Sequence, residues 1–325
     1  MSIAIGMDIG GTKTRCIAID LSSGKILAKA IEGAANPAST PRNIVIDTIR
    51  RCVSACLDSA SRKSSDVVVV GIASAGVGKG YWRKIFEEAL EVLGIASDKI
   101  DVFEDYVAAH VACFLFNSGI LYIAGTGSSL YGVCRDRAVK IGGWGHLLDD
   151  EGSAYQVGRD GIAVALRSWD GREESTELLN ALLKFFNIDN PEMIIPIIYG
   201  SQNPKLLIAS FAKEVVSLAK KGDRKALEII EKSVREIFKS LVVAMKRLDC
   251  RDIGIAIVGG FYEGARELIE PLLLAMLKSI GYARSIVRQV IDISCAAVLI
   301  TLKNRKLLNR EVMERIMNSC RIAYL

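Results

Sequence analysis

The sequence predicts an α/β protein built from two related halves. Short apolar runs alternate with amphipathic stretches, which is the pattern of strands and helices around a largely parallel sheet. Glycine-rich turns beginning at Gly10 and Gly125 each lie between one apolar strand and a following hairpin. This recurrence is an internal repeat, and a repeat is stronger evidence of architecture than an isolated motif.

Length and composition agree with this prediction. The chain has 325 residues, of which 50% are hydrophobic and 24% charged, as in a globular protein. The length suggests two domains, or one large domain with a deep cleft. Only six prolines are present, which excludes a proline-rich linker. Because no apolar run reaches the ~18 residues of a membrane span and residues 1–8 lack a basic start, we expect a cytoplasmic protein with no membrane partner.

The charged residues and cysteines exclude two further classes. The net charge of +5 is mild, and basic residues are interleaved with acidic ones along residues 220–246, so we expect no nucleic-acid partner. The eight cysteines contain no C-x-x-C pair and there are two histidines, which argues against a structural zinc site. Cys52 and Cys56 are spaced for core packing on a helix.

The first half opens with three predicted strands. Residues 3–8 are apolar up to the Gly10 turn, and strands 14–20 and 25–31 are joined by a hairpin at Ser22-Ser23-Gly24. A loop and an amphipathic helix over about 42–60 follow. Residues 67–73 are apolar and β-branched, typical of a strand buried on both faces. The remaining elements are a helix near 82–93, a strand over 100–103 and a helix from Tyr106.

The second half repeats the opening of the first. Residues 121–124 form a strand that ends at the second glycine turn, and strands 129–134 and 138–141 form a hairpin. Residues 153–248 are almost entirely helical, with a break between two long helices at Gly222-Asp223. A buried strand over 253–258 ends at Gly259-Gly260, and helices close the chain from Cys295 onward.

The two glycine turns can bind phosphate. A glycine at a strand end lets the backbone approach a ligand and present its N–H groups as an anion nest. Singly, such a turn is more often a plain hairpin. Neither turn is a Walker A loop, and a hairpin rather than a helix follows the first, which excludes a Rossmann fingerprint. Together they could hold a polyphosphate through Gly10, Gly11, Thr12, Lys13, Thr14, Gly125, Thr126, Gly127 and Ser128.

Two acidic residues stand out in the first half. Asp8 is a carboxylate on an otherwise apolar strand, where a role near Mg²⁺ is favoured over a structural one. Asp105 follows a strand and opens a helix. It is either a helix N-cap or a general base at a strand's carboxyl end, and the sequence leaves both readings open.

The segment 142–155 (GGWGHLLDDEGSAY) is the most unusual in the chain. Its three consecutive acids could accept hydrogen bonds from vicinal hydroxyls, with Trp144 offering a flat apolar face. The same acids could instead be partners of a helix dipole. We interpret His146 as a structural histidine.

These motifs together resemble the BadF/BadG/BcrA/BcrD ATPase family, and within it the eukaryotic-type N-acetylglucosamine kinases and archaeal ATP-dependent hexokinases. Segment 142–155 is highly specific to these proteins, 7–14 and 123–128 match their phosphate loops, and Val258-Gly259-Gly260 matches their adenosine loop. The resemblance covers nearly the whole chain. It implies two ribonuclease-H-like (actin-like ATPase) domains around a nucleotide cleft.

The domain bounds that we expect on this basis are 1–117 and 118–305. The second domain would contain the helical segment 153–248 as an insertion, and a last helix over about 306–325 would pack back on the first domain. Relatives are commonly dimers, so the resemblance implies a homodimer.

The implied activity is ATP-dependent phosphoryl transfer to a sugar hydroxyl, with O6 as the expected acceptor and ATP and Mg²⁺ as cofactors. The sugar would be of the N-acetylglucosamine, glucose or glucosamine type. Asp105 matches the family's catalytic base, and Gly259 and Gly260 lie at the adenosine position. The matching substrate positions are Asn36, Gly76, Asp105, Gly143, Trp144, Asp150 and Glu151.

Three positions depart from the family pattern. Glu104 stands where relatives often carry a neutral residue, and Asp149 adds a third carboxylate. Ala75-Gly76 replaces a Ser-Gly pair that can contact the substrate in kinases of acetylated sugars, which leans toward a broader hexokinase.

Two other functions are alternatives to the kinase. A dehydratase activator with an iron–sulfur cluster needs cysteines on loops, whereas Cys113 is predicted in a helix and Cys134 in a strand. A non-enzymatic sugar-sensing regulator would keep the ATP fold without turnover.

Overall fold

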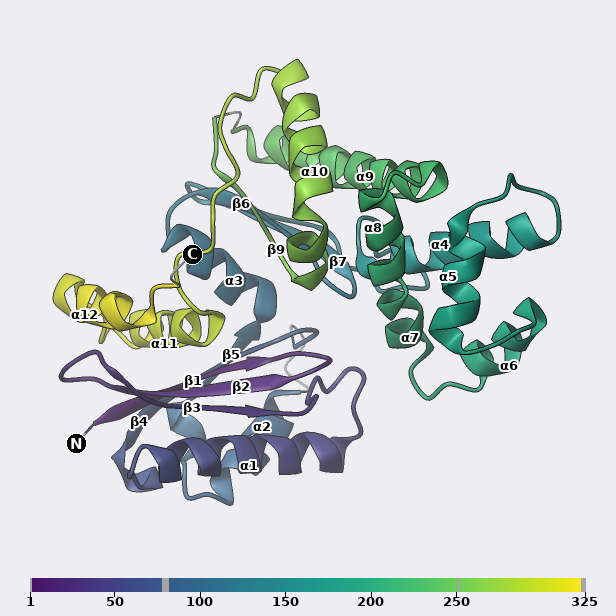
Figure 1. The fold of residues 1–325 in the computed structure, drawn as a ribbon. Coiled ribbons are helices and arrows are strands. Elements are labelled where there is room, and N and C mark those ends of the chain that lie inside the picture. The colour runs from purple at the N-terminus through teal and green to yellow at the C-terminus, as the bar shows by residue number, and fades with distance from the viewer. Residues whose placement is uncertain (1, 78–81, 251, 323–325) are drawn as a thin grey trace. The chain divides into compact units, whose positions relative to one another are not determined.

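The computed structural model describes residues 2–77, 82–250 and 252–322 (Figure 1). The chain divides into two compact units. Unit 1 contains Met1–Asn117 and Gln289–Leu325, and unit 2 contains Ser118–Arg288. The return to unit 1 therefore comes earlier than the predicted boundary after residue 305. The reason is that a whole helix before that point packs on the first sheet.

Unit 1 is built on a five-stranded sheet with the order β3-β2-β1-β4-β5. Strands β1, β2 and β3 are antiparallel neighbours, whereas β4 runs parallel to β1 and β5 parallel to β4. The carboxyl ends of β1, β4 and β5 therefore meet at one edge. The bounds are β1 Ile3–Ile9, β2 Thr14–Asp20, β3 Ile26–Glu32, β4 Val67–Ser74 and β5 Ile100–Glu104.

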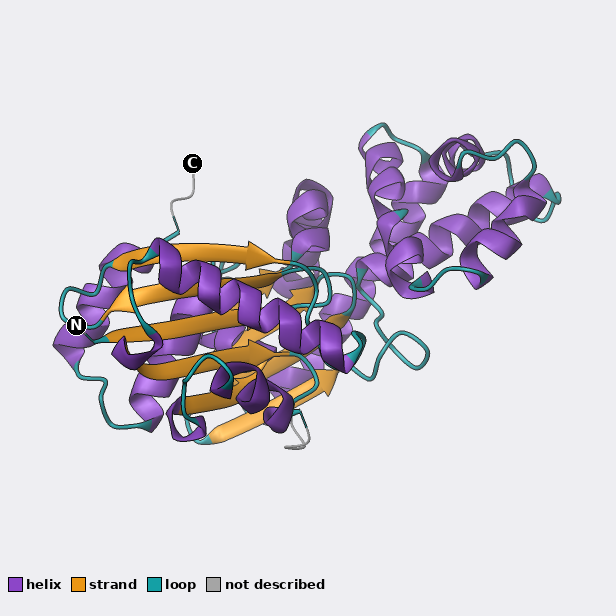
Figure 2. Ribbon diagram, turned by 90° about the horizontal axis from the view of Figure 1, so that it is seen from below, coloured by secondary structure: helices purple, strands orange, loops and turns teal. Residues whose placement is uncertain are grey.

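Helices cover both faces of this sheet. Two of them, α1 (Arg42–Ser59) and α2 (Arg83–Glu91), pack with alternate residues of β1 into one apolar core, and α1 crosses the sheet in Figure 2. The opposite face is covered by α3 (Asp105–Phe114), α11 (Ile293–Asn304) and α12 (Arg310–Cys320). Short 3₁₀ turns at Ser64–Asp66 and Ser97–Lys99 precede β4 and β5.

Two glycines let α11 rest directly on the sheet. Gly6 of β1 and Gly71 of β4 are register partners. A Cβ on Gly6 would lie 2.0 Å from the Ser294 carbonyl oxygen, and one on Gly71 would lie 2.4 Å from that of Ala297. Only glycine allows this contact, because real Cβ atoms do not come so close.

The turn between β2 and β3 is held by Asp20. Its Oδ1 accepts hydrogen bonds from the Ser22 and Ser23 N–H groups, at 3.0 and 2.7 Å, and from both hydroxyls. These bonds lower the pKa of the Asp20 carboxyl to about 2, because they favour its charged form. The hairpin predicted at Ser22-Ser23-Gly24 thus owes its turn to the residue before it.

Unit 2 repeats the same sheet order with four strands, β8-β7-β6-β9. Strands β6, β7 and β8 are antiparallel, and β9 runs parallel to β6. This is the arrangement of β3-β2-β1-β4, so the sheet order matches the repeat seen in the sequence. The bounds are β6 Gly119–Ala124, β7 Ser128–Cys134, β8 Arg137–Gly142 and β9 Ile255–Val258.

Helices make up most of unit 2. Asp223 marks the expected break by capping α9 through the Ala226 N–H, although the preceding helix α8 has only nine residues. The bounds are α4 Ala154–Trp169, α5 Glu177–Phe186, α6 Ile194–Tyr199, α7 Pro204–Ser210, α8 Ala212–Lys220, α9 Arg224–Leu248 and α10 Gly260–Ser279, with a 3₁₀ turn at Pro191–Met193. Helix α10 was not predicted from the sequence pattern. Pro271 interrupts its pattern, but buried Phe261, Ile269 and Leu277 hold it in the core.

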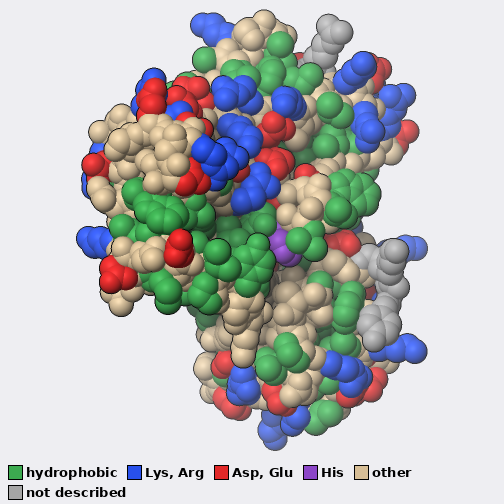
Figure 3. Space-filling model, turned by 90° about the vertical axis from the view of Figure 1, so that its right-hand side faces the viewer, with side chains coloured by type: hydrophobic (Ala, Val, Ile, Leu, Met, Phe, Trp, Pro, Cys, Tyr) green, Lys and Arg blue, Asp and Glu red, His purple; other side chains and the backbone are tan. Residues whose placement is uncertain are grey.

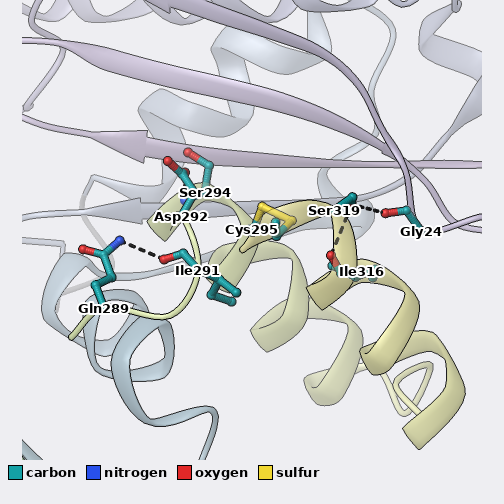
Figure 4. The surroundings of a disulfide bond; sticks show 9 residues. Gly24, Gln289, Ile291, Asp292, Ser294, Cys295, Ile316 and Ser319 are labelled. Atoms are coloured by element: carbon teal, nitrogen blue, oxygen red, sulfur yellow. Dashed lines mark hydrogen bonds between the residues drawn. A yellow bond between two sulfur atoms is a disulfide. The ribbon is translucent and has the colours of Figure 1, made fainter. Parts of the chain in front are cut away.

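Four cysteines form disulfides that the spacings did not predict. Cys134 pairs with Cys250 in unit 2, and Cys295 with Cys320 in unit 1 (Figure 4). The other four cysteines are buried thiols. Disulfides are uncommon in a reducing cytoplasm, so the expected location does not account for them. None of the described helices is long and apolar enough to cross a membrane.

We predict that Asp20→Asn lowers stability at neutral pH. The folded-state pKa lies below the ordinary value near 4, so the ionised group stabilises the fold above pH 4, and this contribution is lost as the pH falls through about 2. Denaturant unfolding should show a loss of about 1 to 2 kcal/mol at pH 7 that shrinks towards pH 2. Asp58→Asn, on the exposed side of α1, is the control and should leave stability at pH 7 unchanged. An equal loss at both pH values would contradict this account.

A second prediction concerns the Cys295–Cys320 bond, which closes a loop of 25 residues. Its removal in Cys320→Ser should cost about 3 kcal/mol by relaxing the unfolded chain. Thermal unfolding with and without a reductant measures the effect. Unfolded but unreduced wild-type protein should titrate as four free thiols, and eight would show that neither bond forms.

Candidate functional site

The predicted site residues of unit 1 lie at the carboxyl edge of its sheet. Ile9, Ser74 and Glu104 are in register across β1, β4 and β5. These three strands therefore end side by side at the same edge of the sheet. The Gly10 turn, the segment with Gly76, and Asp105 follow directly after them. Adjacent strands are about 4.8 Å apart, so the turn and Asp105 begin about two strand spacings from each other.

Asp8 sits on the face of β1 that α11 covers. Its Oδ2 lies 3.2 Å from Nη1 of Arg15, which is its register partner on β2. Burial raises the pKa of the Asp8 carboxyl; the Arg15 charge opposes this, and the nearby Asp292 carboxylate raises the pKa further. Among the described residues no group of three or more His, Cys, Asp and Glu side chains is placed to hold a metal ion. A cation at Asp8 would therefore need ligands from water or a bound molecule.

The first glycine turn is closed by a bond from the Gly10 N–H to the Lys13 carbonyl at 3.0 Å. Thr12 and Lys13 are exposed, but Thr14 is buried and its hydroxyl has no partner in the described structure. The turn also touches the loop that carries Asn36, through the Ala35 N–H. Asn36 Oδ1 accepts the Ala38 N–H at 2.9 Å, so this side chain would meet a ligand through its NH₂ group.

Asp105 is the first residue of α3, and the N-cap position belongs to Glu104. The Asp105 carboxylate accepts the Tyr106 N–H at 2.8 Å, which orients it at the start of the helix. Glu104 Oε2 accepts the Gly76 N–H at 2.9 Å, and Gly76 has a φ of +76°. The departure at Glu104 thus has a structural role, because it holds the turn that contains Gly76.

In unit 2 the second glycine turn docks on the start of α4. The Gly125 N–H bonds to the Gly127 carbonyl at 3.0 Å, and the carbonyls of Gly125 and Thr126 accept the N–H groups of Ala154 and Tyr155. These bonds satisfy donors that a helix N-terminus leaves unpaired. The turn is therefore fixed in place by the segment predicted to bind the sugar.

Gly259 lies against the same turn. It is the N-cap of α10, with a φ of +118°, and a Cβ there would be 2.5 Å from the Ala124 carbonyl oxygen. The parallel pairing of β6 and β9 brings the two segments together. The N-terminus of α10 and the turn at Gly125 consequently form one edge with backbone donors, which suits an anion.

Asp150 is buried beside this turn rather than exposed to a ligand. Its Oδ1 accepts the Ser128 N–H at 3.1 Å, and its Oδ2 lies 2.8 Å from Nζ of Lys205 on α7. Gly127 leaves room for the carboxylate, since a Cβ would be 2.7 Å from Oδ1. No sequence motif pointed to Lys205, because Asp150 lies far from it along the chain.

The rest of segment 142–155 is more open. Glu151 pairs with Arg159 at 3.1 Å, while its carbonyl accepts the Ser128 hydroxyl. Trp144 is 77% exposed, and its backbone N–H donates to Asp149 Oδ2. Gly143, directly before Trp144, has a φ of +74°, a backbone conformation that favours glycine. His146 packs edge-on against Tyr155, in keeping with the structural interpretation.

A separate hollow lies elsewhere in unit 2. It has a volume of about 700 Å³ and is lined by α5 and the segment after it, including Leu183, Ile188 and Met193. Figure 3 shows the apolar side chains on this side of the molecule. None of the predicted site residues lines it, so the candidate site is the set of strand-end residues in each unit.

The two units have sheets with the same strand order, and each sheet has a glycine turn at the end of a strand. These features define a protein of the actin-like ATPase fold. A Chromobacterium violaceum structure named as a candidate N-acetylglucosamine kinase aligns with a TM-score of 0.75 at 22% identity, covering 93% of this chain and 99% of that one. A ROK family glucokinase from Streptomyces griseus, solved with glucose and AMPPNP, aligns with a TM-score of 0.60 at 17% identity, covering 94% and 100%. These likenesses confirm the predicted fold class.

The chain belongs to the BadF/BadG/BcrA/BcrD ATPase family, whose model matches residues 5–286. An N-acetylmuramic acid/N-acetylglucosamine kinase of Clostridium acetobutylicum is 32% identical over 80% of this chain and 85% of its own length. An N-acetyl-D-glucosamine kinase of Dictyostelium discoideum is 25% identical over 94% and 99%. The family resemblance predicted from the motifs is confirmed.

We predict that Gly259→Ala destabilises unit 2. The added Cβ would collide with backbone at Ala124, and its φ is one that alanine avoids, so the loss should be about 2 kcal/mol or more. Gly264→Ala is the matched control, because this helical position of α10 is open, and it should stabilise by up to ~1 kcal/mol. Denaturant unfolding compares the two, and equal effects would show that the close contact is unimportant.

Proposed function

We propose that the protein is an ATP-dependent sugar kinase, which transfers the γ-phosphoryl group of ATP to a hexose or N-acetylhexosamine hydroxyl, with O6 as the acceptor. The observation that carries this is the placement of Asp105 directly after β5, at the same sheet edge as Asp8 and the Gly10 turn. Family membership and the kinase relatives support it.

The glycine turns are proposed to bind the phosphates of ATP, with Gly259 and Gly260 on the adenosine side. The backbone at Gly259 fits this role, because its close contact with Ala124 places the N-terminus of α10 beside the second glycine turn. Backbone N–H groups and the exposed Lys13 would stabilise the charge that develops on the transferred group. Thr14 would act through its backbone, since its side chain is buried.

Asp8 is proposed to hold Mg²⁺ directly or through water. Its surroundings fit a cation, since a part-buried carboxylate faces the like charge of Asp292. When bound, Mg²⁺ would neutralise charge on the phosphate oxygens of ATP.

Asp105 is proposed as the general base. Its bond from the Tyr106 N–H fixes the carboxylate at the start of α3, where it can accept the proton of the sugar hydroxyl as the oxygen attacks phosphorus. Little covalent chemistry is needed beyond this, because positioning and electrostatics dominate phosphoryl transfer.

Asn36, Gly76, Gly143, Trp144 and Glu151 remain the proposed sugar contacts, whereas Asp150 is given another role. Because the Asp150 carboxylate is bonded to Ser128 and Lys205, we propose that it braces the turn and that Glu151 accepts the hydrogen bonds of the sugar hydroxyls. The resemblance also supports the proposal of a cytoplasmic homodimer.

The iron–sulfur alternative receives no support from the cysteines. Such a cluster needs accessible thiolates, whereas Cys16, Cys52, Cys56 and Cys113 are buried and the other four are in disulfides.

The kinase proposal is tested by ADP release against a panel of sugars. The panel contains glucose, mannose, glucosamine, N-acetylglucosamine, N-acetylmannosamine and N-acetylmuramic acid. Asp105→Asn should lower turnover at least 100-fold while ATP still binds, because only the proton acceptor is lost. Asp47→Asn, on the exposed side of α1, should behave as wild type. Near-normal turnover by Asp105→Asn would refute the assigned base, and ATP hydrolysis indifferent to every sugar would refute the kinase.

A further inference from the structure

A second carboxylate, Asp292, approaches Asp8 from the start of α11. A Cβ on Gly6 would point at Ser294, so this side of β1 faces the first turn of α11. Asp8 is two residues beyond Gly6 and its side chain therefore projects to the same side. Asp292 precedes Ser294 by two residues, and its charge acts on Asp8. Nothing in the sequence motifs singled it out.

The pair lies next to a polar group that lacks a partner. The Ser294 hydroxyl is fully buried and makes no hydrogen bond within the described structure. Figure 4 shows Asp292 and Ser294 side by side at the start of α11, with both side chains directed towards the sheet. An unsatisfied buried hydroxyl costs free energy, which a bound water or ion at this position would recover.

The turn that carries Asp292 is held firmly. Asp292 Oδ1 accepts the Ser294 N–H at 2.8 Å, and the Asp292 N–H donates to the Cys320 carbonyl at 3.3 Å. The Cys295–Cys320 disulfide and the bridge between Ile291 and Arg321 tie the same turn to the end of α12. The carboxylate is thus fixed beside Asp8 rather than swinging in solvent, which preorganises it for a ligand.

We propose that Asp292 is the second carboxylate of the Mg²⁺ site, acting with Asp8 on the cation that accompanies the nucleotide. This inference rests on the proposed kinase function. Mg²⁺ is usually held by one or two carboxylates together with substrate phosphates and water, so a pair is sufficient. The charges of Arg15 and Lys13 oppose the negative charge at Asp8 in the absence of the cation.

A purely structural role for Asp292 is the alternative, because it is also the N-cap of α11. Asparagine caps a helix as well as aspartate does. Asp292→Asn therefore keeps the cap and removes only the charge. Asp223→Asn, at the N-cap of α9 in unit 2, is the matched control for this exchange.

The experiment measures Mn²⁺ binding to the full chain in saturating ADP, by the loss of the free Mn²⁺ electron paramagnetic resonance signal. Asp292→Asn should bind Mn²⁺ at least tenfold more weakly than wild type. Its ADP affinity in EDTA should match wild type, and its thermal midpoint without metal should be equal or higher, because a like-charge contact is removed. Asp223→Asn should bind Mn²⁺ normally.

The other outcomes separate the two ideas. Wild-type Mn²⁺ affinity in Asp292→Asn overturns the inference and leaves the kinase proposal intact. A lower midpoint with weaker ADP binding in EDTA shows a structural role and also overturns it. If Asp292→Asn does not fold, Asp292→Ser is tested in its place, because serine keeps a capping hydroxyl. If neither variant folds, Asp292 is required for folding and the inference is overturned. Failure of wild type to bind ADP would refute the proposed function itself.

Discussion

The direct contact between α11 and the first sheet is the constraint on which unit 1 depends. Gly6 and Gly71 occupy paired positions in two apolar strands, and the helix backbone fills the space that side chains would take. Helix α11 is buried along residues 294–302, so it is an internal helix without an amphipathic pattern. Its position then decides where its first turn meets β1, and hence what surrounds Asp8.

Both units place a carboxylate and a basic partner beside a glycine turn. Asp8 pairs with Arg15 at the first turn, and Asp150 pairs with Lys205 at the second. Burying such groups costs free energy unless they are paired or bind a ligand. Charged side chains are thus buried beside turns that follow apolar strands, against the usual rule that such positions are apolar. Violations of this kind are expected at functional sites.

The sequence was sufficient for features that depend on local pattern. Strand β2 has the predicted bounds, and both glycine turns follow their strands, because apolar runs and glycines act over a few residues. Features set by distant residues escaped prediction: the Lys205 partner of Asp150, the Asp292 neighbour of Asp8 and the disulfides all need the tertiary fold. The early return to unit 1 was missed for the same reason, since only the packed sheet shows where α11 belongs.

The division of unit 1 between the two ends of the chain has a consequence for its synthesis. Residues that cover one face of its sheet leave the ribosome after all of unit 2, roughly 170 residues later than Asn117. At ordinary elongation rates this delay is roughly 10 to 35 s. For that time α3 is already available to cover part of this face, but α11, which packs directly on Gly6 and Gly71, has not yet been made. Unit 2 is contiguous and can complete its core first, so the nascent chain carries a finished second unit beside an open first one.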